Sequence, residues 1–559
     1  MTTTTNRLTQ GLAALPAGDK TLLRLCFAIA LLALALGVLA GVATAAVRAG
    51  FIQTDLASGY RLMTTHGVNV FFYWLYFVQA GLLLVISAVY ASGEGRIAWR
   101  AMAWLGLVAM VLGFGVSGYA TLVGVPRLYD APPELAHPGE PGVAAFYVGY
   151  LLLAAGLFSI ATAGVATALH SRFAARSPRA EGWSAIGFAA VAWAGLLMVS
   201  ALASLYAFFP AALWALDLGT MPADYATRWH VLFHNMHYLP LMSTVLVWYV
   251  LVENVTGVKS IFGARFSKII FALYLMFVPP TSLYHMFLEP DLAAPVRVIG
   301  SLLSLFISVP TVLVFLVLVC SLEVHARNQG AQGLFGWMRK LPWGNPAMAA
   351  MGAAVINLAL GGVFSFVLIQ EKLAPLLSDT FFVPGYFHFL TVGTVSLTFL
   401  AALCYVLPGL TGARLWRPTV LARLPWLVTL GVGLFGAAGI AAGYNGVPRR
   451  VLSVAYDQGA PAVWGLLMKG IGVGGTLMAI ALLVYLYGLL RTLLTRAGAP
   501  APQAALPSVC WEGPVVARHQ AWMGPLSVIV LVGAMALFTQ VAFVLLRTLP
   551  LMAGSGAGH

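Results

Sequence analysis

Long apolar runs separated by short polar connections dominate the chain, and they recur from about residue 21 to about residue 548. Each run is long enough to cross the roughly 30 Å hydrocarbon core of a bilayer as a helix. The pattern predicts an all-α membrane bundle of about thirteen transmembrane helices. The predicted spans are residues 21–47, 66–92, 99–124, 143–170, 183–216, 229–252, 268–288, 297–321, 347–371, 381–410, 424–443, 462–492 and 521–548.

Composition supports a chain that lies in lipid. Of its 559 residues, 61% are hydrophobic and only 8% are charged, which excludes an ordinary soluble protein. No stretch remains for a soluble catalytic domain, so any chemistry is expected between helices. We therefore predict one membrane domain over residues 1–559, with a short cytoplasmic N-terminal tail at 1–20, and we expect the first apolar run to be a retained helix.

The formal charge of +13 does not indicate nucleic-acid binding, because the basic residues fall in short connections between the apolar spans. Connections after even-numbered spans are rich in Lys and Arg, for example Arg172 and Arg176, whereas odd ones hold acids such as Asp130 and Asp217. The positive-inside rule then places the N-terminus in the cytoplasm and the C-terminus outside. Four scattered cysteines form no disulfide, zinc or dinuclear copper pattern.

Histidines gather toward the outer side of this predicted topology. A lone histidine in a membrane is often explained by an interhelical hydrogen bond. Convergence of six of the eleven histidines from four spans favours a redox or metal centre instead, because neutral imidazole ligates haem iron, copper and zinc. The six are His66 at the start of span 2, His230, His234 and His237 in span 6, His285 in span 7, and His388 roughly 10 Å down span 10.

Helical spacing adds detail to this cluster. His234 and Tyr238 are four residues apart and share one helical face with His230, although an aromatic and polar packing stripe is the competing interpretation. Tyr386 and His388 are two residues apart, so they point to different sides of span 10, and one helix could address two sites.

Two adjacent cations, Arg449 and Arg450, lie near the predicted outer surface in the segment GVPRR. Guanidinium groups suit carboxylates such as haem propionates. A plain pair of loop charges is the alternative.

Several segments, in order along the chain, resemble subunit I of the haem-copper oxidase superfamily, particularly the B-type cytochrome c oxidases. The resemblance covers essentially the whole length. It is carried by LMTTHGV (62–68), FHNMHY (233–238), VPPTSLYHMFLEP (278–290), GLFGWMRKLPWGNPA (333–347), VPGYFHF (383–389) and NGVPRR (445–450).

The resemblance implies roles for individual residues. His66 and His388 match the two axial ligands of the low-spin haem, a b-type haem in this subfamily. Arg449 and Arg450 match the arginines that hold its propionates. His234 matches a copper ligand.

Two further matches concern the second centre. Tyr238 matches the tyrosine that the family links covalently to the copper-ligating histidine before it. His285 matches the second histidine of a copper-ligating pair.

Two departures affect this second, oxygen-reducing centre. Tyr284 stands where the family has the first histidine of the copper-ligating pair, and Tyr386 stands where it has the proximal ligand of the high-spin haem. Three explanations compete. Tyr386 could ligate a high-spin haem as tyrosinate while His237 or His230 replaces the lost copper ligand. The second haem, the copper or both could be absent. The pocket could instead bind another metal or a quinone.

The proton route that the resemblance implies also departs from the family. Tyr249 and Thr311 remain, but Val245, Val314 and Val317 stand where the B-type pattern carries hydroxyl groups. The missing metal ligands and the missing hydroxyl groups of the proton route would both be explained if the chain no longer reduces dioxygen.

From these residues we expect a respiratory-type electron-transfer subunit that binds a low-spin bis-histidine haem b in a bacterial or archaeal plasma membrane. A subunit II-like partner and a c-type cytochrome or cupredoxin donor on the outer side are implied by the resemblance. The alternatives are an oxygen or nitric oxide reductase with a tyrosine-ligated haem, and a cofactor-free transporter or scaffold.

Overall fold

The computed structural model describes residues 7–92, 95–123, 138–174, 184–223, 225–279, 295, 299, 302–303, 306–368, 374–452 and 459–495. Tyr284, His285 and the predicted last span at 521–548 lie outside this set. The backbone of His230 and His234 is described, but their side chains are not.

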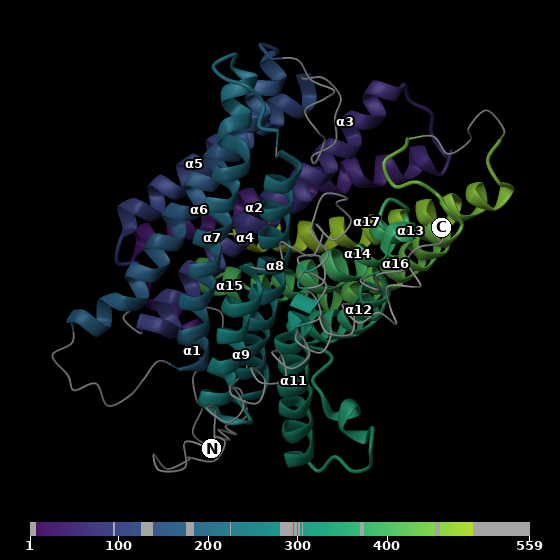
Figure 1. The fold of residues 1–559 in the computed structure, drawn as a ribbon. Helices are drawn as coiled ribbons and strands as arrows, with labels where there is room; N and C mark the ends of the chain where they lie inside the picture. The colour runs from purple at the N-terminus through teal and green to yellow at the C-terminus, as the bar shows by residue number, and fades with distance from the viewer. Residues whose placement is uncertain are drawn as a thin grey trace.

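The described chain is a series of helices (Figure 1). In order they are α1 (Arg7–Ala14), α2 (Ala17–Arg48), α3 (Leu56–Gly67), the π-helix η1 (Val68–Trp74), α4 (Leu75–Ile86), the π-helix η2 (Ser87–Ser92), α5 (Arg100–Val123), α6 (Pro141–Ala174), α7 (Ala185–Ala215), α8 (Tyr225–Thr256), α9 (Gly263–Phe277), α11 (Ser308–Asn328), the 3₁₀-helix η5 (Gly336–Lys340), α12 (Pro346–Leu368), α13 (Ala374–Leu377), α14 (Phe382–His388), the π-helix η6 (Phe389–Ser396), α15 (Leu397–Thr411), α16 (Pro418–Tyr444) and α17 (Ala462–Leu494).

Eleven continuous helices within the described residues are long and apolar enough to cross a membrane. The predicted all-α membrane bundle is thus confirmed. The predicted number of thirteen is not reached in this part of the chain, since span 268–288 is described only as far as residue 279 and the last span is not described. The predicted N-terminal tail at 1–20 contains the short helix α1, whose Leu8 and Leu12 are buried.

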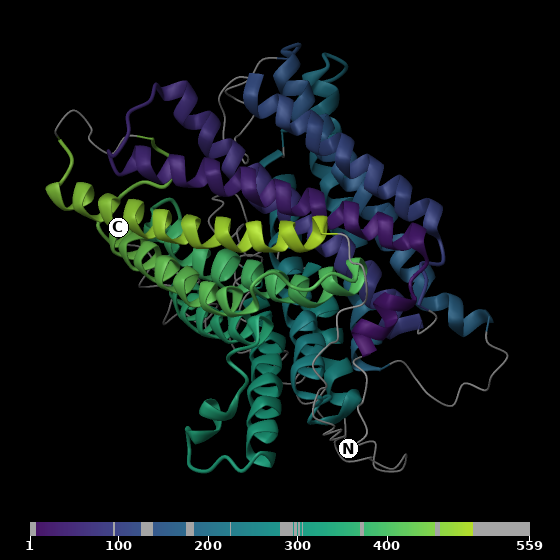
Figure 2. The same ribbon diagram turned by 180° about the vertical axis from the view of Figure 1, so that it is seen from behind.

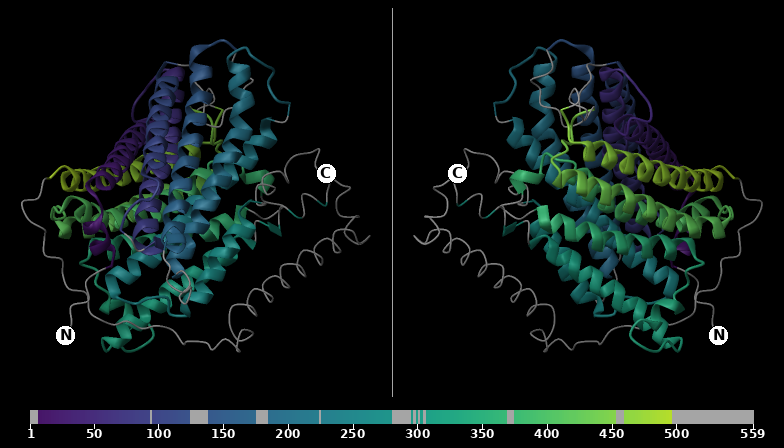
Figure 3. Two further views of the ribbon diagram at one scale, coloured as in Figure 1. Left: turned by 90° about the vertical axis from the view of Figure 1, so that its left-hand side faces the viewer. Right: turned by 90° about the vertical axis from the view of Figure 1, so that its right-hand side faces the viewer.

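The helices form one packed bundle. Figure 2 shows α17 lying beside both α16 and α2, and the side views of Figure 3 show α16 and α17 running together along one flank. Glycines allow the close approach of α14 and α16, because a Cβ on Gly439 would meet Gly385 at 2.8 Å. Helices in membranes commonly use small residues in this way to bring backbones together.

Span 2 begins earlier than predicted. The helix starts at Leu56 rather than at residue 66, and Asp55 caps it by accepting a hydrogen bond from the Ser58 amide at 2.9 Å. The bond from Ser58 also lowers the pKa of the Asp55 carboxyl. His66 is therefore close to the end of α3 and inside a continuous transmembrane helix, not at its opening.

A π-helical segment begins within two residues after each of two histidines. His66 is the last residue but one of α3 and precedes η1, while His388 is the last residue of α14 and precedes η6. A π-helical turn is rare, and it changes the direction of the side chains that follow. Such segments are frequent at functional sites, which directs attention to these two histidines.

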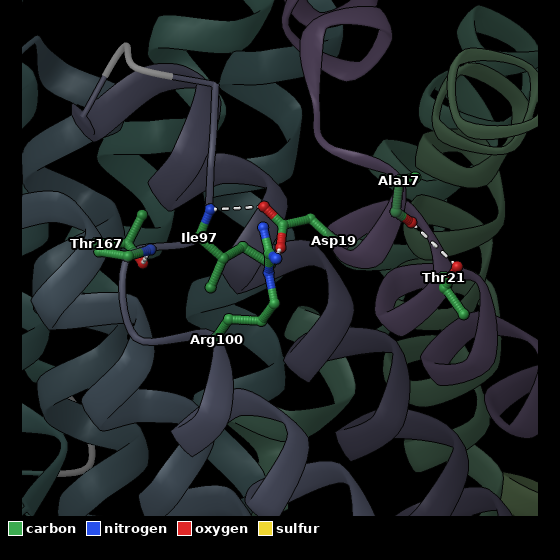
Figure 4. Close-up of polar contacts among 7 residues, drawn as sticks. Ala17, Asp19, Thr21, Ile97, Arg100 and Thr167 are labelled. Atoms are coloured by element: carbon green, nitrogen blue, oxygen red, sulfur yellow. Dashed lines mark hydrogen bonds and ion pairs between the residues drawn. The ribbon is translucent and has the colours of Figure 1, made fainter.

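A buried carboxylate joins the start of α2 to the start of α5. Asp19 is fully buried, forms an ion pair with Arg100 and accepts a hydrogen bond from the Ile97 amide at 2.9 Å (Figure 4). Next to it, the Thr167 hydroxyl accepts from the Ala98 amide at 3.1 Å. These bonds fix the connection before α5 against α2 and α6.

We expect Asp19→Ala to destabilise the protein by about 1–3 kcal/mol, because it leaves the buried Ile97 amide without its acceptor. Thermal unfolding of the purified protein in detergent measures this as a lower melting temperature. Glu323→Ala is the matched control. It removes an exposed i, i+4 pair with Arg327, which should change stability by less than about 0.5 kcal/mol. Equal effects of the two substitutions would contradict the structural role of Asp19.

Candidate haem site

The imidazole rings of His66 and His388 face one another between α3 and α14. Their planes differ by only 10°, and their centroids are 6.3 Å apart. This is too far for direct stacking contact. Two metal–nitrogen bonds of about 2 Å each span about 4 Å. The rest of the centroid separation is the distance from each ligating nitrogen to the centre of its own ring. The spacing therefore accommodates one metal ion between the two imidazoles.

Each ring is held by its Nδ1 atom. His66 Nδ1 donates to the Gly37 carbonyl at 2.8 Å, and His388 Nδ1 donates to the Pro384 carbonyl at 2.7 Å. A carbonyl oxygen can only accept, so Nδ1 carries a proton in both rings, and in the neutral imidazole Nε2 keeps its lone pair. In metal-ligating histidines, a hydrogen bond from the other ring nitrogen orients the imidazole and makes it more basic.

Neighbouring groups restrict both rings. A Cβ on Gly41 would lie 2.5 Å from His66 Nδ1, so only glycine leaves room for the ring against α2. On the other side, the Phe435 ring lies 4.1 Å from the His388 ring between centroids. These contacts leave little freedom for either imidazole to turn.

A cavity of about 270 Å³ contains both histidines. Its walls are mainly apolar and come from α2, α3, η1, α4, α14, η6, α16 and α17. Three arginines, Arg48, Arg449 and Arg450, are the charged residues of the lining. A haem has an apolar macrocycle, an iron that imidazoles ligate, and propionate carboxylates that guanidinium groups bind. The residues present thus fit a haem.

The loop after α16 carries Arg449 and Arg450 and is fixed to the segment before α14. Phe381 donates its amide to the Val447 carbonyl at 2.7 Å, and Arg449 donates its amide to the Asp379 carbonyl at 3.0 Å. The Arg449 guanidinium also pairs with the Asp379 carboxylate at 3.1 Å. This bonding connects the arginine loop directly to the helix of His388.

Comparison with known proteins agrees with this geometry. Residues 21–477 match the family described as cytochrome c and quinol oxidase polypeptide I. The chain belongs to this family. It is 29% identical over 461 residues to cytochrome c oxidase subunit 1 of Thermus thermophilus, which covers 79% of this chain and 78% of the relative.

Two other similarities extend the comparison. Heme-copper oxidase subunit I+III of Aeropyrum pernix is 27% identical over 452 residues, covering 78% of this chain and 48% of that longer protein. The solved structure of a heme-copper terminal oxidase dimer superposes with a TM-score of 0.78 at 21% identity, covering 86% of this chain and 85% of that one, which shows a shared fold. This chain is thus a multi-pass membrane subunit of the respiratory oxidase type, from a family that generally binds haems and copper and works with a subunit II.

In this oxidase-family chain, Tyr386 and His388 lie in different surroundings. The Tyr386 ring packs 6.0 Å from Phe382 and 6.1 Å from Phe387, and Tyr386 does not line the cavity that holds His388. Tyr238 on α8 is close enough to Tyr386 for an electrostatic interaction. The two tyrosines therefore lie together, outside the cavity of the histidine pair.

His237 lies between two phenylalanine rings. Its centroid is 4.7 Å from that of Phe71 and 4.8 Å from that of Phe387, and both contacts are edge-to-face. Both phenylalanines also line the cavity that contains His66 and His388. The role of His237 in replacing a copper ligand stays a prediction, and the side chains of His234, His230 and His285 lie outside the described residues.

Hydroxyl groups near α8, α9 and α11 form two short chains. Tyr249 donates to Ser267 at 3.0 Å, and Ser267 bonds Ser260 at 2.5 Å. Tyr274 and Thr311 share a bond of 2.8 Å. Sequence reasoning identified Tyr249 and Thr311 but missed the serines and Tyr274.

The valines at the positions where the resemblance led us to expect hydroxyl groups are buried: Val245 and Val314 are 0% exposed and Val317 is 3% exposed. Tyr238 lies eleven positions before Tyr249 on α8, or about 16 Å along the helix at 1.5 Å per residue. Val245 lies in this interval, and so do the buried hydroxyl residues Ser243 and Thr244.

Sequence reasoning also missed the groups that support the histidine pair, namely Gly37, Gly41, Arg48 and Phe435. Arg48 had a readable signal, because it is a cation that ends an apolar helix on the side predicted to be poor in Lys and Arg. The glycines had none, since α2 contains many small residues and only the tertiary contact distinguishes these two.

Proposed function

We propose that this chain is an electron-transfer subunit that binds one low-spin haem b between His66 and His388. The observation that carries the proposal is the pair of nearly parallel imidazoles at 6.3 Å, each with Nδ1 bonded to a carbonyl. A histidine that serves only as an interhelical hydrogen bond would not need a second, nearly parallel imidazole at this distance.

A haem bound here would supply a one-electron redox couple. Within the chain, His66 and His388 would ligate the iron, while Arg449 and Arg450 would hold the propionates. Positive charge beside the site favours the reduced form, because reduction adds a negative charge. The arginine loop would therefore raise the reduction potential as well as orient the ligand.

The second centre is proposed to be altered, so that the chain does not reduce dioxygen. Tyr386 and Tyr284 stand where the resemblance implies ligands, and Val245, Val314 and Val317, where it implies hydroxyl groups, are buried valines. The placement of Tyr386 against Phe382 and Phe387 supports a packing role for this tyrosine. His234, His237 and His285 remain the candidate ligands if copper is bound.

Electrons are proposed to enter from the outer side through a subunit II-like partner that receives them from a c-type cytochrome or a cupredoxin. Relatives include a probable quinol oxidase subunit 1 of Staphylococcus aureus, 24% identical over 303 residues. A quinone is therefore the alternative donor. A membrane orientation with the N-terminus in the cytoplasm agrees with the distribution of Lys and Arg.

Cofactor analysis of the purified full-length protein tests this proposal. We expect one b-type haem and no copper from an anaerobic reduced-minus-oxidised spectrum, a pyridine haemochrome assay and metal analysis. Two haems with copper would favour an active oxygen or nitric oxide reductase. The absence of haem, after expression in a host that supplies it, would favour a scaffold or transporter and overturn the proposal.

A further inference from the structure

Arg48, the last residue of α2, is a buried cation that no motif identified. Its relative exposure is 7%, and it lines the cavity that contains the histidine pair. Its guanidinium lies 4.6 Å from the centre of the Phe381 ring. A desolvated guanidinium is costly unless its donors are satisfied, so its bonds reveal what the residue does.

Those bonds go to the backbone of the arginine loop. Arg48 Nη1 donates to the Arg449 carbonyl at 2.7 Å, and Nη2 donates to the Pro448 carbonyl at 2.9 Å. The planar fork of a guanidinium fits two adjacent carbonyls, which a lysine ammonium cannot match. Arg48 therefore donates hydrogen bonds to two consecutive backbone carbonyls, and the second of these belongs to Arg449.

Other elements fix the same loop from different sides. The Tyr60 hydroxyl on α3 donates to the Arg450 carbonyl at 3.0 Å, and Asp379 holds the amide and guanidinium of Arg449. Helix α2 also supplies the Gly37 carbonyl that orients His66. The loop is thus tied to the helices of both histidines, and Arg48 is its link to α2.

We propose that Arg48 is a positioning residue that anchors the Arg449–Arg450 loop and keeps a third positive charge beside the carboxylates of the bound haem. The inference rests on the proposed haem site. Without Arg48, the loop keeps its bonds to Asp379 and Tyr60 but loses its link to α2, and the site loses one cation.

Two measurements on the full chain test this proposal. In R48M, we expect the potential of the b haem to fall by about 59 mV, a tenfold shift in a one-electron equilibrium, in an anaerobic spectroelectrochemical titration. In the haem-free protein, we expect the backbone amides of residues 445–447 and 449–452 to exchange with deuterium about tenfold faster. R48K keeps the charge but not the fork, so its exchange should rise while its potential falls less.

R24M is the matched control, because Arg24 is on the same helix and donates a single bond of 3.4 Å to the Leu493 carbonyl. It should leave both readouts unchanged. If R48M leaves the reduction potential of the haem or the amide exchange of the loop unchanged, the inference is overturned. If R48M does not accumulate, R48K provides the exchange test. If the wild-type protein binds no haem, this result counts against the proposed function. The exchange measurement would still test whether Arg48 anchors the Arg449–Arg450 loop.

Discussion

Replacing His388 with alanine is expected to abolish the low-spin b-haem signal of the purified protein, whereas Tyr386→Phe should leave it intact. His388 provides one of the two facing imidazoles, and alanine removes this ring without filling its place. Tyr386 is two residues away on the same helix, but it lies outside the cavity of the histidine pair. The reduced-minus-oxidised spectrum and the haem-to-protein ratio measure both effects.

The Tyr386→Phe variant serves as the control for damage to α14, because it changes the same helix and keeps the aromatic ring. A His388→Ala protein that retained the bis-histidine spectrum would show that another residue ligates the iron. Loss of the low-spin signal in Tyr386→Phe would instead show that the two sites are not separate. Thermal unfolding of both variants establishes that each remains folded.

Gly41→Val is expected to weaken haem binding at least tenfold, or about 1.4 kcal/mol. Even the first atom of the new side chain would lie 2.5 Å from His66 Nδ1 and 2.7 Å from its Cε1. The ring cannot move aside freely, since Nδ1 is bonded to Gly37 on the same helix. Either the imidazole leaves its parallel orientation or α2 moves outward.

Haem retention during purification and the low-spin electron paramagnetic resonance spectrum would measure this effect. Gly433→Ala is the control, because a Cβ there meets nothing within 4 Å, although Gly433 also lies in a transmembrane helix. It should keep the haem and could add about 0.4–1 kcal/mol of stability. A Gly41→Val protein with wild-type haem content and spectrum would contradict the role assigned to Gly41.

His388 can be recognised as a functional residue from the sequence, whereas Gly41 cannot. A histidine inside an apolar helix is costly in lipid and therefore informative by its identity alone. Gly41 is one of 58 glycines, and nothing in its neighbours along the chain distinguishes it. Its importance comes from the absence of a side chain at the point where another helix places an imidazole.

The boundary of span 2 shows a limit of hydropathy. Residues 56–65, LASGYRLMTT, are too polar to be included in an apolar run, yet they form most of α3. Tertiary contacts stabilise this extension. Tyr60 donates to the Arg450 carbonyl, and a Cβ on Gly59 would collide with the Leu452 side chain. A periodicity argument cannot anticipate such support from residues nearly 400 positions away.

The sequence by itself determined the membrane bundle, because apolar runs of this length have no stable alternative to helices in lipid. It also determined which residue types could ligate iron and hold carboxylates, since His66, His388, Arg449 and Arg450 are informative as chemistry. The tertiary structure alone decided how the two rings lie relative to one another, which nitrogen of each ring bonds a carbonyl, and that Arg48 and Gly41 lie beside them. Those properties depend on contacts between helices distant in the chain, and such contacts leave no local pattern in the sequence.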